Sequence, residues 1–451
     1  MQKKMTREGR LRKPHCREWP GFLRRVIPDQ NWRRLEQLAT KGMDPRTRWS
    51  PKLIILCWVM MGWSIQGQLT ERFREGRETL SRMFYRRRRC GESYPGLTQA
   101  TQRAGMDVFR RFWDRLRTSV PQRVGSAWTW YGWTVFAVDG SRIDAPRTRR
   151  NEKALGQAAR DKSHPQWWIT RLIHLPTKMM WAWRQGPGTS SERAHLREMI
   201  PSLPPRSLLV GDTGFGGFDL LWQLSNGKVA FVIRCGGNST LLVENTRQEI
   251  ERKGDVRWVY LWPKHRRRTK PLRLRLIVLK NRGQRVYLLT NVEDTTRLSR
   301  GMAGEFYRAR WGIEVEYRGL KQTLGHRKVL ARTPEPGGME LAADILALAL
   351  LLLYAALVMG AKVARLSLAQ ALRAIRWAME ALRHGESCTQ LLRRLREAVA
   401  DEYERHSSKR ARDWPHKKNE RPPRPPRLRR LSRTENARIE RFLMHHRAQV
   451  T

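Results

Sequence analysis

In the first part of the chain, residues 1–130, the apolar positions recur with helical spacing. Residues 1–130 read as basic helices, with one continuous apolar segment from Leu53 to Trp63 (LIILCWVMMGW). The stretch from Leu97 to Trp113 is compatible with a small helical DNA-binding unit or with plain supporting helices. The pattern therefore predicts a basic helical region over 1–130 that binds DNA or supports the rest of the molecule.

Short β-type runs replace the helical spacing from residue 134 onward. Five strands are predicted, at 134–139, 167–175, 179–184, 207–212 and 229–234. A helix follows the third strand, where Thr189-x-x-Glu192 has the spacing of a capping box, and another covers 218–224. This β-β-β-α-β-α-β order is typical of a mixed α/β sheet with helices on its faces.

A second β-rich stretch, at about 236–300, departs from that order. Its β-type segments are 256–262, 272–280 and 285–292. The basic run Lys264 to Arg268 between the first two is either a solvated turn or a phosphate contact. We interpret the stretch as an insertion into a core domain that spans 131–335.

Helical patterns return after the sheet, at 305–328, 339–361 and 368–382. The uncharged run from Ile345 to Ala361 is at the short limit for a membrane span, and a buried core helix explains it equally well. We expect no membrane association. Residues 336–400 are expected to pack on the core or to mediate assembly. Residues 401–451, which include RPPRPPRLRR, are expected to form a flexible basic tail.

The charge balance narrows the choice of partners. The chain has 451 residues, with 90 Lys+Arg against 41 Asp+Glu and a formal net charge of +49. Such a charge repels itself unless a polyanion neutralises it; nucleic acid is the usual partner, and an anionic membrane surface is the main competitor. The 5 Cys form no CxxC pair or Cys/His cluster, which argues against a zinc module and favours free thiols in a reducing cytosol.

Two aspartates close apolar strands and are followed at once by glycine-containing turns. Asp139 lies in VDGS at 138–141, and Asp212 lies in GDTG at 211–214. A carboxylate at a strand end beside flexible backbone is placed to hold a hard cation. Either residue taken alone is also typical of an ordinary turn.

The segment YRARWGIEVEYRGLK, residues 307–321, predicts a helix with one functional face. At about 100° per residue, four side chains fall within a stripe of about 60°: Tyr307, Arg310, Glu314 and Lys321. Glu316 points the other way, so Glu314 is the candidate that shares a site with the aspartates. The alternative is a solvated face with charge pairs four residues apart.

These motifs together resemble the DDE transposases of bacterial insertion sequences. The spacing Tyr307-x2-Arg310-x3-Glu314-x6-Lys321 matches the YREK signature of the group named after insertion sequence number four. VDGS and DTGF resemble the two Asp motifs of that group, and the resemblance covers about 134–332. Thr213 is a departure, because many relatives have a basic residue after the second Asp.

The resemblance implies an RNase H-like core whose β-rich insertion lies between the second Asp and the Glu. It implies that the catalytic residues Asp139, Asp212 and Glu314 hold two divalent cations, Mg²⁺ or alternatively Mn²⁺. Asp139 would bridge the two ions. Four residues are expected to contact DNA, the first three by motif and the last by its place on the helix: Tyr307, Arg310, Lys321 and Trp311.

The function implied is that of a DNA transposase and endonuclease. Such an enzyme cleaves the ends of a mobile element by hydrolysis and joins them to target DNA by transesterification. The expected partners are double-stranded DNA and a second copy of the chain in a paired-end complex, in the bacterial cytoplasm at the nucleoid. The alternative is a DNA-binding relative without catalysis, although the intact acidic triad argues against decay.

Overall fold

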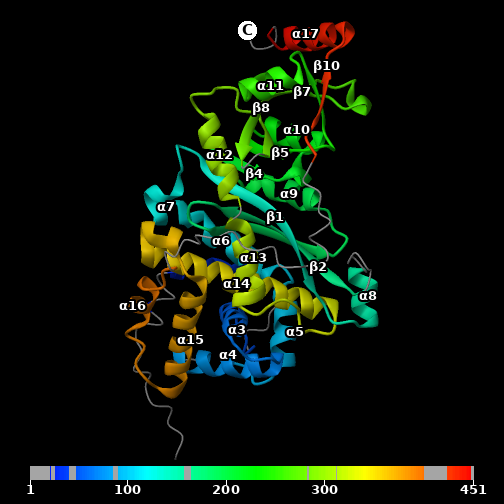
Figure 1. Cartoon of the computed structure of the whole chain (residues 1–451). Coiled ribbons are helices and arrows are strands. Elements are labelled where there is room, and N and C mark those ends of the chain that lie inside the picture. The colour runs from blue at the N-terminus through cyan, green and yellow to red at the C-terminus, as the bar shows by residue number, and fades with distance from the viewer. Residues whose placement is uncertain are drawn as a thin grey trace, which may run out of the picture.

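The computed structural model has an α/β fold, with a mixed sheet flanked by helices and with helical N- and C-terminal regions (Figure 1). It describes residues 21, 26–39, 47–84, 90–156, 164–281, 284–310, 312–400 and 424–447. The architecture is consistent with the RNase H-like fold expected from the sequence. In Figure 1 the β-rich insertion and α17 lie at one end of the molecule, and α3, α4 and α15 lie at the other.

The N-terminal region is helical, as predicted. Its helices are α2 (Asp29–Ala39), α3 (Pro51–Trp63), α4 (Leu69–Met83), α5 (Tyr94–Ala104), α6 (Val108–Leu116) and α7 (Val120–Val124). Helix α3 starts sharply because the Ser50 side chain accepts a hydrogen bond from the Leu53 backbone N–H and Pro51 occupies the first helical position. This helix is apolar on all sides and is accordingly buried, packed against α4 and α14.

The first five strands form one half of the sheet in the order β3-β2-β1-β4-β5, with β3 at the edge. They are β1 (Thr134–Asp144), β2 (Gln166–His174), β3 (Met179–Pro187), β4 (Ser207–Gly211) and β5 (Ala230–Cys235). Strands β1, β4 and β5 are parallel neighbours, whereas β2 runs antiparallel to both β1 and β3. The connecting helices are α8 (Arg149–Leu155), α9 (Glu192–Met199) and α10 (Phe218–Asn226).

The β-rich insertion continues the same sheet and does not form a separate one. Strand β5 pairs with β9, and the full order of the ten strands is β10-β6-β7-β8-β9-β5-β4-β1-β2-β3. The elements of the insertion are β6 (Thr240–Val243), α11 (Arg247–Lys253), β7 (Asp255–Leu261), β8 (Leu272–Asn281) and β9 (Gln284–Thr290). The sequence pattern predicted the last three strands and missed β6.

The C-terminal segment closes the outer edge of this sheet. Strand β10 (Arg427–Arg430) pairs in parallel with β6, and helix α17 (Arg433–Arg447) buries Ile439 against Trp262. The prediction of a flexible tail is wrong for these two elements, because the edge of β6 supplies backbone partners that a local pattern does not reveal. The remainder of the predicted tail, 401–423 and 448–451, lies outside the described residues.

The predicted single helix over 305–328 is broken in the structure. It consists of α12 (Arg300–Ala309), α13 (Gly312–Arg318) and a π-helical turn, η6 (Gly319–Thr323). The later helices are α14 (Pro334–Met359), α15 (Leu368–His384) and α16 (Leu391–Arg396). Short 3₁₀ turns occur at η1 (Arg117–Ser119), η2 (Gly125–Trp128), η3 (Ile200–Ser202), η4 (Thr213–Phe215), η5 (Lys264–Arg266) and η7 (Gly360–Arg365).

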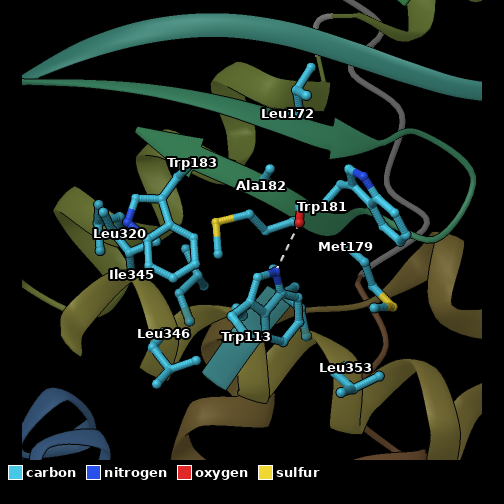
Figure 2. Close-up of a cluster of buried hydrophobic side chains, with 14 of the residues drawn as sticks. Trp113, Leu172, Met179, Trp181, Ala182, Trp183, Leu320, Ile345, Leu346 and Leu353 are labelled. Carbon is cyan, nitrogen blue, oxygen red and sulfur yellow. Dashed lines mark hydrogen bonds between the residues drawn. The ribbon is translucent and has the colours of Figure 1, made fainter. Parts of the chain in front are cut away.

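Helix α14 runs through the core between the sheet and the N-terminal helices. It is long and apolar enough to cross a membrane, but 89% of its most apolar window is buried inside the protein. Figure 2 shows its Ile345 and Leu346 beside Trp183 of β3 and Trp113 of α6. The Trp113 indole N–H donates to the Trp181 carbonyl oxygen at 3.0 Å. Burial accounts for the uncharged run, and α6 acts here as a supporting helix.

Cys57, Cys90 and Cys235 are free and buried, and burial raises the pKa of the Cys235 thiol to about 11. The expectation of free thiols holds for these three residues.

Candidate active site

Asp139 and Asp212 reach the same edge of the sheet on neighbouring parallel strands. Ala137 of β1 is paired with Val210 of β4, and each aspartate lies two residues beyond its member of that pair. Strand β1 does not end at Asp139 as predicted but continues to Asp144, because its outer half pairs with β2 alone. Both aspartates are partly exposed, so their carboxylates are accessible to a cation from solvent.

The two aspartates also face the same side of the sheet. Val135 of β1 packs against α12, and Ala137 packs against α13. Successive strand residues alternate between the two faces, so Asp139 lies on the side that α12 and α13 cover. The same alternation in β4 places Asp212 on the side of Val210, which belongs to the α12 cluster.

Backbone N–H groups hold one oxygen of each aspartate. Asp139 Oδ1 accepts from the Gly140 N–H at 2.9 Å, and Asp212 Oδ1 accepts from the Gly214 N–H at 2.8 Å. The second bond opens the 3₁₀ turn η4 directly after β4. The glycine-containing turns noted in the sequence thus orient the carboxylates they follow.

Helix α13 is fixed to the strand that carries Asp139. The Tyr317 hydroxyl donates to the Asp139 carbonyl oxygen at 2.8 Å, and the Tyr317 ring stacks on the fully buried Arg171 guanidinium, whose carbon is 3.8 Å from the ring centroid. Glu314 occupies α13 one turn before Tyr317, about 60° around the axis. Its side chain lies outside the part of the chain that is described, as does the whole of Trp311.

The break between α12 and α13 changes the predicted helix face. Arg310 ends α12, and the Ile313 backbone N–H donates to the Arg310 carbonyl oxygen at 3.0 Å. Arithmetic for one continuous helix therefore does not apply across this break. The shared face of Glu314 with Tyr307 and Arg310 stays a prediction, because the Glu314 side chain lies outside the described residues. Tyr307 and Arg310 are 7% and 6% exposed, packed on one another with the guanidinium carbon 5.6 Å from the ring centroid.

Lys321 belongs to the π-helical turn and not to the helix of Glu314. Its side chain is partly buried, which lowers the pKa of the ammonium group, while the carboxylate of Asp144 opposes that shift. It is the most exposed of the described residues predicted to bind DNA.

Glu192 borders the turns that follow the two aspartates, and the sequence pattern did not single it out. Burial raises the pKa of its carboxyl to about 7, and the charges of Asp139 and Asp212 add to this shift. Ser191, not Thr189, caps α9 by accepting from the Ala194 N–H at 3.4 Å, so the predicted capping box is wrong. The signal in the sequence was a Glu in the first turn of the helix after the third strand, which is also the commonest place for an acidic residue.

Two arginines of the basic run in the insertion form ion pairs within the protein. Arg266 pairs with Asp219 at 2.9 Å, and Arg267 pairs with Glu435 of α17 at the same distance. The second ion pair ties the basic turn to the C-terminal helix. In this conformation the basic run helps to pack the insertion against the C-terminal helix. Neither the solvated turn nor the phosphate contact considered from the sequence included that role.

The donor set suits a hard dication. Carboxylate oxygens are the ligands that Mg²⁺ takes from proteins, and Asp139 and Asp212 offer them side by side. Among the residues whose placement is described, no group of three His, Cys, Asp or Glu side chains converges closely enough to hold one ion. The side chain of Glu314 is not among those residues.

Comparison with known proteins gives a match over the part of the chain that carries these residues. The family model described as the transposase DDE domain matches residues 130–352. The chain is 25% identical over 303 residues to the Transposase InsG for insertion sequence element IS4 of Escherichia coli (strain K12). That alignment covers 62% of this chain and 65% of the relative, so the chain spans about two thirds of the length of the curated protein it matches.

Proposed function

This chain belongs to the DDE transposases of the IS4 group through residues 130–352, and from this premise we propose that it is a DNA transposase. It would cleave the ends of a mobile element and join them to target DNA by hydrolysis and transesterification of phosphodiesters. Its partners would be double-stranded DNA and a second copy of itself in a paired-end complex in the bacterial cytoplasm.

One observation carries the proposal. Asp139 and Asp212 emerge on neighbouring parallel strands, on the same face, with one oxygen of each held by a glycine N–H. The helix of Glu314 lies over that face and is tied to Asp139 through Tyr317. Ordinary turn aspartates do not require this convergence of two strands and a helix.

We infer that Asp139, Asp212 and Glu314 would hold two divalent ions, Mg²⁺ or Mn²⁺. When bound, such a pair activates the attacking oxygen and stabilises the leaving oxygen of the phosphodiester. The residues of this chain supply the orientation: Gly140 and Gly214 fix the aspartate carboxylates, and Tyr317 sets the position of α13.

The DNA contacts fall into two groups. Lys321, which is partly exposed, and Trp311 are proposed to grip the strand beside the carboxylates. Tyr307 and Arg310 are buried in this conformation, so a DNA contact from either requires that the groups covering it move on binding. The large positive excess of the chain would supply sequence-independent attraction to phosphates.

The test uses a supercoiled plasmid that carries the genomic DNA flanking the coding sequence. Wild-type protein should nick it in Mg²⁺, whereas Asp139→Asn and Asp212→Asn should bind it but leave it uncut. Asp294→Asn is the matched control, because Asp294 caps an exposed turn in which Thr296 donates to its carboxylate. Tight binding without cleavage by the wild type would support the non-catalytic alternative instead.

A further inference from the structure

We propose that Glu192 is a fourth carboxylate of this site and donates an oxygen ligand to one of the divalent ions beside Asp139 and Asp212. The inference rests on the proposed function, because it assigns a further residue to the same metal site. The sequence led us to expect three acidic residues in this site. Glu192, which lies on a different helix from Glu314, would be the fourth.

Glu192 enters the site over two glycines. A Cβ atom added to Gly140 would lie 2.7 Å from Glu192 Oε1, so the carboxylate fills the space of a side chain at Gly140, on the opposite face of β1 from the Asp139 side chain. A Cβ atom added to Gly214 would lie 3.7 Å from Glu192 Oε2 and 3.0 Å from Asp212 Oδ1. Glu192 thus borders both aspartate turns at once.

The start of α9 is fixed in this place by contacts on both sides. The Arg193 Nε–H donates to the Gly214 carbonyl oxygen at 2.5 Å, which ties the helix to the turn after Asp212. His195 Nδ1 lies 3.0 Å from Thr170 Oγ1 of β2, which ties the same helix to the strand beside Asp139. The position of Glu192 therefore follows from the fold and is not that of a free surface side chain.

The carboxylate of Glu192 is partly buried without a counter-charge in direct contact. Within the described ranges, no hydrogen bond or ion pair ends on it, and Arg142 and Arg193 influence it only at longer range. Glu198, two turns along α9, instead pairs with Arg184 at 2.8 Å and is largely exposed. A partly buried carboxylate beside two others is costly unless a cation compensates it.

The charge of two divalent ions and the direction from which Glu192 approaches the aspartates both favour Glu192 as a metal ligand. Two divalent ions carry four positive charges, which three carboxylates do not neutralise and four do. Glu192 reaches the aspartates from α9, whereas Glu314 is carried by α13 on the face of Asp139. The two glutamates would thus approach the aspartates from different helices, which suits a pair of ions better than a single one.

The experiment measures Mn²⁺ binding to the full-length protein by titration calorimetry without DNA. Loss of even an outer partner of a metal ligand costs about 10–100-fold in affinity, so loss of a direct ligand in Glu192→Gln should weaken Mn²⁺ binding at least about 10-fold. Glu198→Gln, the same change on the same helix, should bind Mn²⁺ as the wild type does. Unchanged affinity in Glu192→Gln would overturn the inference.

Two further variants separate this inference from the proposed function. If Asp139→Asn and Asp212→Asn lose Mn²⁺ binding while Glu192→Gln keeps it, the metal site stands and only the role of Glu192 fails. If none of the three affects binding, the metal site itself fails. Thermal unfolding of Glu192→Gln without metal should match or exceed the wild-type Tm, which excludes misfolding as the cause of weaker binding.

Discussion

A methyl group on Gly140 has no room between Trp168 and Glu192. An added Cβ would lie 2.5 Å from Trp168 Cζ2 and 2.7 Å from Glu192 Oε1, both closer than atoms in contact approach. Trp168 is held by the Arg142 guanidinium on its ring and by its own indole bond to Thr170 at 3.1 Å. Gly140→Ala must therefore displace Trp168 or Glu192.

Overpacking of this kind costs about 1–3 kcal/mol of unfolding free energy. Gly67→Ala is the matched control, because an added Cβ there meets no atom within 4 Å, and its change should stay within about 0.5 kcal/mol. In a Glu192→Ala background the cost of Gly140→Ala should fall by about 1 kcal/mol, since one of the two obstructing groups is gone. The cost should not vanish, because Trp168 remains.

Urea unfolding followed by tryptophan fluorescence provides the measurement. Gly140→Ala should lower the midpoint without changing the slope, which marks a change in stability alone. Equal midpoints for Gly140→Ala and wild type would refute the packing of Glu192 over Gly140. If Gly140→Ala lowers the free energy of unfolding equally in the wild type and in Glu192→Ala, the added methyl group is obstructed by Trp168 alone.

Three other changes probe separate parts of the structure. Tyr317→Phe removes the bond to the Asp139 carbonyl oxygen and should cost about 1–2 kcal/mol in urea unfolding, with slower DNA cleavage and unchanged DNA affinity. Burial, together with the charge of Asp344, raises the pKa of the Glu340 carboxyl above its usual value, so the folded state holds a proton that the unfolded chain loses above pH 4.5. The stability of the wild type relative to Glu340→Gln should therefore fall as the pH rises above 4.5, and a constant difference would contradict this. Ile439→Ala should weaken docking of α17 by about 2–5 kcal/mol and expose the C-terminal segment to trypsin, whereas Glu440→Ala on the exposed face should not.

The strands that carry the aspartates were predictable because their signal is local. Apolar runs of strand length ending in Asp-Gly or Asp-Thr-Gly mark β1 and β4 without reference to the rest of the chain. The family resemblance implied that Asp139 and Asp212 share a site, and the parallel pairing of β1 with β4 brings them to one edge of the sheet. The apolar sequence of α14 likewise predicted burial or a membrane, and packing decided between them.

Other features depend on contacts that a local pattern does not contain. Strand β10 lies in a Pro- and Arg-rich segment and exists because the edge of β6 accepts it. The break at Arg310 required knowledge of how α12 and α13 pack on different parts of the sheet. Glu192 was missed because its importance comes from Gly140 and Gly214, which lie in other elements.

The central claim is that Asp139 and Asp212 hold divalent ions for DNA cleavage. The most direct measurement is Mg²⁺-dependent nicking of the flank-bearing plasmid by wild type and by Asp212→Asn, with DNA affinity determined for both proteins in the same buffer. We expect nicking by the wild type, none by the variant, and equal affinity for DNA. Nicking by Asp212→Asn at the wild-type rate would contradict the account.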